Sequence, residues 1–511
     1  MLKHYINAIS IRGGDTAASS ALTKTFRRPS SLSVSGGAVT TTTPNQISET
    51  SHTLSKMRTA TLNALHQTSF LIVVSTSIVA FSPLPSLTRH LAQTISTKPI
   101  TDATSQSPQS KAIQLLSILS SISASIELFA SPLVGVWIDS WGRKVPTIAL
   151  YSLIVLGNAC VVLHPCVWSI SFSKVVNGAV GGFLVVVANA VIADFFAVTT
   201  KKEKSLHGQD QMGTAMGRQA AAVSLGFLLG SLIGVRLMEI GERLAYGCSL
   251  VFSILAVLNG AFQMMDSAEL SRKNNDDAGV ISHSHSWDHE TLRQKVLEAP
   301  LSSVQLLFYY GSKMRTLALL LMLQSAPMYM GDVFQLFAKE YWGLTPKAFG
   351  SIIALFGVLG IVSNLSLPLL LNNLGLRNVS LLSIASSLFF PLTTILTTNY
   401  KAVIAAGCAG LYSSTQKIGT SAAMTSLASE LGVRQGQLQG EKASMLALFR
   451  ILCPVVYGML YLTGKEWSLE KDNGMMGGTL SVIRGWIGTK LPFVLNIILG
   501  IVAFVITWNN I

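Results

Sequence analysis

Long apolar runs are the feature that most constrains this chain of 511 residues. Most of them hold roughly 18 to 25 residues, enough to cross about 30 Å of hydrocarbon as helices. Half of the residues are hydrophobic and 12% are charged, about half of the charge that a soluble domain carries. The sequence therefore predicts an all-α membrane protein that crosses the bilayer many times.

Twelve transmembrane helices can be drawn along the chain. They lie near 66–92, 112–138, 145–164, 167–196, 216–237, 243–265, 305–335, 346–371, 377–397, 400–424, 441–463 and 488–508. The polar stretch 266–304 divides them into six and six, the layout of a duplicated transporter. We expect a six-helix bundle over 66–265, a cytoplasmic linker over 266–304 and a second bundle over 305–511.

The N-terminal segment 1–65 is rich in Ser, Thr and Gly and poor in acids. Such a composition cannot bury a core, so we expect a disordered tail. Acid-poor segments with Ser and Arg also serve as organellar transit peptides, which leaves a targeting role open.

Basic residues set the expected orientation. The net charge of +13 is suited to nucleic acid, but it lies in the tail and in loops, as the positive-inside rule requires. This pattern predicts cytoplasmic termini in a multi-pass membrane protein, and no nucleic-acid partner. The five cysteines are odd in number and mostly apolar in context, so no disulfide, metal or cofactor site is expected.

The stretch "GVWIDSWGRK" follows the second apolar run. Gly135 permits close helix packing, and Asp139 can accept hydrogen bonds from a helix N-terminus or an arginine. Gly142 permits a tight turn, while Arg143 and Lys144 anchor the loop on the cytoplasmic side.

In this stretch the chain resembles the major facilitator superfamily, whose signature loop lies between the second and third helices. The resemblance implies that residues 135–144, here called the latch loop, stabilise one of two alternating conformations. It also implies that Asp194, in "VIADFF", is the acid partner of the loop. Helix capping is the alternative role for Asp194. Ser140 stands where the family usually has a base.

Two further stretches resemble family patterns. "FSKVVNGAVGG" places Lys174 where many members carry an arginine linked to proton transfer, although a lysine near a helix end also reaches the interface. "GFLLGSLIG" spaces Gly226, Gly230 and Gly234 four apart, as a helix-packing face does. It resembles the antiporter signature, with Ser231 in place of its proline.

The stretch "RQGQLQGEKASMLALFRILCPVVYGMLY" resembles the tetracycline/proton antiporters and the eukaryotic tetracycline-transporter-like group. Arg434, Gly436 and Gly440 carry this second-half loop, and the glycines predict a tight re-entry into the following helix. The stretch "NNLGLRN" is a degenerate copy of the latch loop, with Asn372 in place of the aspartate.

Ionisable residues inside apolar runs are costly, by about 3 kcal/mol at the bilayer centre, and are candidates for proton coupling. Glu127 is the clearest, and Lys174 and Asp332 are the others. A neutral Glu127 hydrogen-bonded across helices is the alternative. The first apolar run lacks the acid that the tetracycline exporters carry there, which leaves their substrate and mechanism open for this chain.

Amide side chains inside the apolar runs are candidates to line a polar cavity, although each alone also suits an interhelix hydrogen bond. They are Asn189, Gln219, Gln324, Gln335, Asn364 and Gln416.

The resemblance implies a secondary active transporter that moves a small organic solute by alternating access, as proton-coupled efflux. The expected partners are the solute, protons and the lipid bilayer, and the expected state is a monomer. A uniporter or symporter, and a membrane receptor or scaffold that has lost transport, are the alternatives. No nucleophile–base or metal set suggests an enzyme.

Overall fold

The computed structural model describes residues 44–80, 83–96, 108–202, 206–264, 306–344, 346–472 and 488–510. Every regular element within these ranges is a helix. The chain divides into two compact units, Met1–Ser55 and Lys56–Ile511. The described part of the first unit is the beginning of helix α2, and the second unit holds all the other helices.

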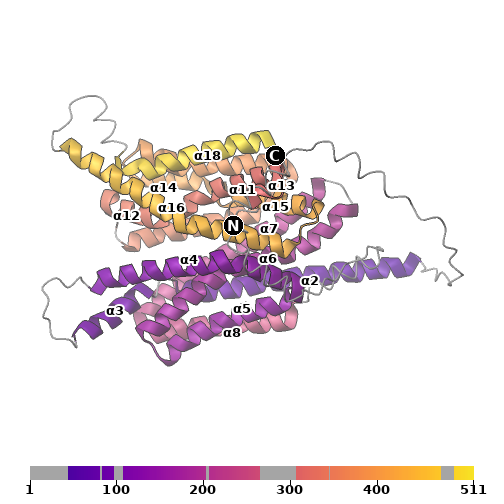
Figure 1. Cartoon of the computed structure of the whole chain (residues 1–511), viewed down its shortest axis with the longest axis horizontal. Helices are drawn as coiled ribbons and strands as arrows, with labels where there is room; N and C mark the ends of the chain where they lie inside the picture. Colours follow the sequence, from indigo (N-terminus) through magenta and orange to yellow (C-terminus); the bar gives the residue numbers. More distant parts are fainter. Residues whose placement is uncertain are drawn as a thin grey trace, which may run out of the picture. The chain divides into compact units, whose positions relative to one another are not determined.

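The helices before residue 265 are called the first set (Figure 1). They are α2 (Pro44–Ile78), α3 (Pro83–Ser96), α4 (Pro108–Trp141), α5 (Lys144–Leu163), α6 (Val167–Lys202), α7 (Leu206–Ile240) and α8 (Glu242–Gln263). Within this set α4 packs on α6, and α5 packs on both α6 and α8.

The helices after residue 305 are called the second set. They are α11 (Ser312–Ser325), η2 (Ala326–Met330), α12 (Gly331–Trp342), α13 (Pro346–Leu396), α14 (Tyr400–Ala409), η3 (Leu411–Thr415), α15 (Gln416–Glu430), α16 (Gln435–Asp472), η4 (Gly488–Lys490) and α18 (Leu491–Asn510). Within this set α13 packs on α14 and α18, and α11 packs on α15 and α18.

Eight described helices are long and apolar enough to cross a membrane, and nine if the bent pair Ser312–Met330 and Val333–Trp342 is one span. The expected count of twelve is therefore not confirmed. One of the eight, Ala354–Leu396, has 43 residues, which is about 65 Å of helix and twice the thickness of a bilayer. It breaks at Gly375, whose φ of 73° is left-handed, so two of the expected spans lie within this single element.

The first expected span, 66–92, differs in the structure. The helix α2 begins at Pro44, inside the segment expected to be disordered, and ends at Ile78. A separate helix, α3, begins at Pro83 and also contains Pro85. A proline has no N–H for the preceding turn but fits the first turn of a new helix, so this sequence divides the span.

A buried network of hydrogen bonds connects four helices of the first set. Ser75 and Ser249 share a 2.9 Å hydrogen bond, and Asn158 donates to Ser249 Oγ at 2.9 Å and accepts from Ser173 Oγ at 3.2 Å. These residues belong to α2, α8, α5 and α6. Because apolar surface gives little association energy inside a bilayer, such interhelix hydrogen bonds help to hold the set as one body.

Two helix pairs carry most of the contact between the sets: α4 lies along α16, and α7 lies along α13. In Figure 1 the indigo-to-purple α4 runs beside the orange-to-yellow α16, although they come from opposite halves of the sequence. The candidate site lies along the first of these pairs.

Candidate functional site

The latch loop joins α4 to α5 in a single tight turn. Gly142 has a φ of 84°, a left-handed conformation that suits glycine. The turn leaves Arg143 buried, at 5% exposure, and Lys144 half-buried at the start of α5. The local sequence therefore points the guanidinium inward, toward α4 and α6.

Asp139 connects the latch loop to the second set. Its two carboxylate oxygens accept hydrogen bonds from the backbone N–H groups of Gly436 and Gln437, at 2.9 and 2.8 Å. These N–H groups belong to the first turn of α16, which has no acceptors of its own for them. A carboxylate at a helix N-terminus also meets the positive end of the helix dipole. Asp139 thus acts as the cap of a helix from the other set.

Arg143 lies between two carboxylates of the first set. Its Nη1 donates to Asp139 at 2.8 Å, and its Nε and Nη2 donate to the two oxygens of Asp194 at 2.8 and 3.0 Å. Burial alone lowers the pKa of Arg143, but Asp194 and Asp139 outweigh burial and raise it above its ordinary value. The arginine therefore stays charged and fixes the orientation of Asp139.

Glycines allow α4 and α16 to touch backbone to backbone next to these ion pairs. A Cβ at Gly135 would collide with the carbonyl of Gly436, and a Cβ at Gly440 would lie 2.6 Å from the carbonyl of Ser131. One turn further along α16, Ser444 donates to the carbonyl of Leu128 at 2.7 Å. The sets are thus closed against each other at this end of α4.

The degenerate copy of the latch loop keeps its turn but not its charge. Gly375 makes the break in α13, while Asn372 is exposed. Arg377 donates to the backbone carbonyl of Trp508 at 2.7 Å and lies over its ring, 5.4 Å from the centroid. This arginine is thus used within the second set.

Glu127 forms an ion pair between the sets. Its Oε2 lies 3.0 Å from Nη1 of Arg450 on α16, and its carboxyl packs on Gly182 of α6. Tyr329 of η2 interacts electrostatically with both charges and donates to the carbonyl of Leu446 at 3.3 Å. The residues next to Glu127 in the sequence are apolar, and its charged partner Arg450 comes from the second set.

Two basic residues of this region, Arg450 and Lys417, are not among the sequence-based candidates. Both stand inside expected spans, Arg450 within 441–463 and Lys417 within 400–424, so the criterion that selected Glu127 also selects them. Of the other coupling candidates, Lys174 is half-buried on α6, and Asp332 lies on α12 with its side chain outside the described residues.

The amide candidates lie on several helices of both sets. Gln219 donates to Ser69 at 2.6 Å, while Gln416 donates to the carbonyl of Gln324 at 2.8 Å. Asn364 is buried, Asn189 is half-buried and Gln335 is exposed. Three of the six thus make interhelix hydrogen bonds, the alternative weighed above.

The glycines of α7 lie against the backbone of α2. A Cβ at Gly226 would be 2.9 Å from the carbonyl of Phe70, one at Gly230 would be 2.6 Å from that of Val74, and one at Gly234 would collide with Ile78. This contact is inside the first set and is separate from the latch loop.

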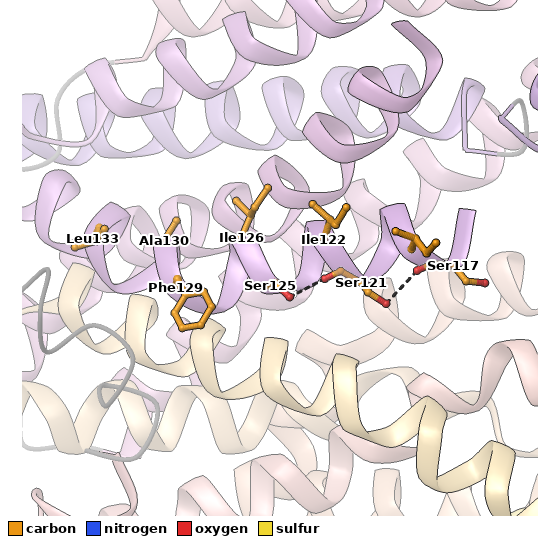
Figure 2. Close-up of a pocket in the computed structure, with 9 residues that line it drawn as sticks. Ser117, Ser121, Ile122, Ser125, Ile126, Phe129, Ala130 and Leu133 are labelled. Carbon is orange, nitrogen blue, oxygen red and sulfur yellow. Dashed lines mark hydrogen bonds between the residues drawn. The ribbon is translucent and has the colours of Figure 1, made fainter. Parts of the chain in front are cut away.

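A pocket of about 710 Å³ runs along α4 from Ser117 to Leu133 (Figure 2). Three serines, Ser117, Ser121 and Ser125, form a ladder in which Ser121 and Ser125 donate to the carbonyl four residues earlier. Ile122, Ile126 and Phe129 supply apolar wall. The pocket has one helix for its wall and no charged group, so it is not the candidate site.

Among the described residues, no group of three or more His, Cys, Asp or Glu side chains is placed to hold a metal ion. The charged groups described along α4 and α16 form ion pairs and cap the first turn of α16.

Known proteins resemble this chain in sequence. Residues 68–440 match the profile of the Major Facilitator Superfamily. Multidrug resistance protein 2 of Bacillus subtilis is 22% identical over 344 residues, covering 66% of this chain and 77% of that protein. The class E tetracycline resistance protein of Escherichia coli is 22% identical over 360 residues, covering 68% and 79%.

Two solved structures share the fold. The human organic anion transporter MFSD10 (TETRAN) superimposes with a TM-score of 0.58 at 14% identity, over 88% of this chain and 99% of that one. The proton:xylose symporter XylE superimposes with a TM-score of 0.62 at 12% identity, over 89% and 96%.

The chain is a multi-pass membrane transporter. It belongs to the major facilitator superfamily, which confirms the resemblance drawn from the latch loop and the second-half loop. Family membership also makes it a transporter rather than an enzyme.

Proposed function

We propose that the chain moves a small organic solute across a membrane by alternating access, coupled to protons, with export as the direction of transport. The proposal includes twelve crossings in two six-helix bundles, a monomer, and termini on the cytoplasmic side. The names of its multidrug and tetracycline resistance relatives support export, and the Lys and Arg residues of the latch side support the orientation.

The observation that carries the proposal is the seam between α4 and α16. Three polar contacts along the seam join one set to the other. They link Asp139 to the N-terminus of α16, Ser444 to Leu128, and Arg450 to Glu127. A transporter must break and remake such contacts to expose its site to each side in turn. The seam thus defines a conformation closed at the latch end.

Glu127 is the proposed proton carrier. In the closed seam its negative charge is balanced by Arg450. A proton on Glu127 removes that balance and weakens the hold between α4 and α16, which links proton binding to the position of the sets.

Flux in proteoliposomes tests the proposal. A panel of small organic solutes is loaded with and without a pH gradient, and wild type is expected to move one of them faster when the gradient is present. Glu127→Gln is expected to abolish the effect of the gradient. Glu239→Gln, which alters an exposed ion pair on α7, is the matched control. Gradient-dependent flux that survives in Glu127→Gln would show that another group carries the proton.

Co-transport of solute and proton is the second candidate. The pairing of Glu127 with Arg450 favours it, because a solute that takes over Arg450 leaves the carboxylate free to accept a proton. Reversing the pH gradient in the same vesicles distinguishes exchange from co-transport. Exchange is fastest when the solute and the higher proton concentration are on opposite sides of the membrane, and co-transport is fastest when they are on the same side.

A further inference from the structure

Two consecutive residues of the short helix η2, Met328 and Tyr329, interact with three charged side chains: Lys417, Glu127 and Arg450. Tyr329 of η2 interacts electrostatically with Glu127 and Arg450. The preceding residue of η2, Met328, contacts the ammonium of Lys417 through its sulfur, and Lys417 is the second residue of α15. Consecutive residues of η2 therefore connect the ion pair of the seam with a lysine.

The charges in this region do not balance. Glu127 is neutralised by Arg450, whereas Lys417 has no carboxylate within ion-pair distance among the described residues. Among the described side chains, one positive charge is thus left over beside η2. An uncompensated cation inside a bilayer is costly, by about 3 kcal/mol, and marks a position where a partner is missing or arrives later.

The surroundings of Lys417 indicate what kind of partner fits. Met328 is 67% exposed and Lys417 is half-buried, so the described side chains leave the thioether largely uncovered and the lysine partly uncovered. Arg450 is 39% exposed on its side chain, although one of its N–H groups holds Glu127. Tyr329 also packs against an aromatic cluster that includes Phe334 and Phe337. Cations beside apolar and aromatic surface suit an acid with an apolar body.

We propose that Lys417 binds the carboxylate of a small organic anion, with Arg450 adding positive charge and with Met328 and Tyr329 contacting its apolar body. This inference rests on the proposed function and names the class of its solute. A proton on Glu127 removes the negative charge closest to Arg450, so anion and proton bind cooperatively. That linkage is the one that co-transport needs.

A pair of probes with one body and opposite charges tests the inference: 1-naphthoate and 1-naphthylmethylammonium. The full-length protein is purified, its thermal unfolding is followed with each probe, and the flux of each is measured in proteoliposomes. Wild type is expected to be stabilised by 1-naphthoate and to transport it, and to do neither with the cation.

The variants isolate the role of Lys417. Lys417→Gln is expected to raise the KM for 1-naphthoate by about tenfold, and Lys417→Arg to restore it. Lys313→Gln, which changes an exposed lysine of α11, is the matched control and is expected to leave the KM unchanged. Transport of the cation in place of the anion, or an unchanged KM in Lys417→Gln, would overturn the anion inference and leave the proposed function standing.

Asp332 requires a separate variant, because this acid follows η2 by two residues in the chain. The variant Asp332→Asn is expected to keep 1-naphthoate transport. If Lys417→Gln with Asp332→Asn recovers what Lys417→Gln loses, Lys417 belongs to a structural ion pair and the inference fails. If wild type transports neither probe, the inference also fails. The proposed function is then still tested by flux of the solute panel and by the effect of Glu127→Gln on that flux.

Discussion

The guanidinium of Arg450 lies 3.0 Å from the carboxylate of Glu127, although 323 positions separate the two residues in the chain. The pair joins α4 to α16 in the same seam that Asp139 closes at its end. Charges of opposite sign thus meet where the two sets meet, and the seam responds to any change in either charge.

Replacing the carboxylate of the latch is expected to open the seam. Asp139→Asn keeps the size of the side chain but removes its charge from Arg143 and from the N-terminus of α16. We expect a loss of roughly 2 kcal/mol, or about thirtyfold in the ratio of closed to open conformations.

The rate at which maleimide labels the variant Ser131→Cys reports the ratio of closed to open conformations. Ser131 is fully buried in the seam, and its hydroxyl has no hydrogen-bond partner among the described residues, so Ser131→Cys is a small change. In a background without the native cysteines, Asp139→Asn is expected to speed maleimide labelling at this site. Equal rates with and without Asp139→Asn would mean that the latch does not hold the seam closed.

Close packing along α16 gives a second prediction. A methyl group at Gly440 would meet the carbonyl of Ser131, whereas one at Gly458 of the same helix meets nothing within 4 Å. We expect Gly440→Ala to slow solute flux at least tenfold, because the closed conformation no longer forms, and Gly458→Ala to stay within about twofold of wild type. Similar rates for the two variants would show that the backbone contact has no part in transport.

Lys442 of α16 is 5% exposed, and its ammonium has no hydrogen-bond partner among the described residues. Lys442→Met is expected to raise the free energy of unfolding by about 1 to 3 kcal/mol, because it removes a buried charge and keeps the side-chain length. Thermal unfolding in detergent checks this, with the exposed Lys401→Met as control. A lower melting temperature for Lys442→Met would instead reveal a partner for the ammonium.

Cys166 in the loop between α5 and α6 gives a pH-dependent prediction that also reports topology. Hydrogen bonds with Ser169, whose Oγ lies 3.6 Å from the sulfur, hold the pKa of the thiol below its ordinary value. The reactive thiolate therefore forms at lower pH than in a free cysteine.

Ser169→Ala should move the pH of half-maximal maleimide labelling upward. With Cys166 as the single cysteine, an impermeant maleimide should label it from the side opposite the latch loop, because α5 separates the two. Labelling from the latch side would overturn the proposed orientation.

Sequence patterns predicted the helical membrane architecture and the family, because apolar length and the Asp139–Arg143 spacing are local properties. They also selected Asp194 and the glycines of the second-half loop before any contact was known. The pairing of Glu127 with Arg450 and the capping of α16 by Asp139 were not predictable, since they join positions about 300 residues apart. The break before Pro83 falls inside one expected span, because the apolar residues on both sides of the prolines predict a single crossing.

The latch also has an electrical consequence. Asp139, Arg143 and Asp194 hold two carboxylates against one guanidinium, and all three belong to the first set. Their counterpart in the second set is the end of a helix, which carries roughly half a positive charge. When the seam opens, a net negative cluster and a partial positive pole move apart. We therefore expect the balance between the two conformations to depend on ionic strength and on the voltage across the membrane, even with no solute bound.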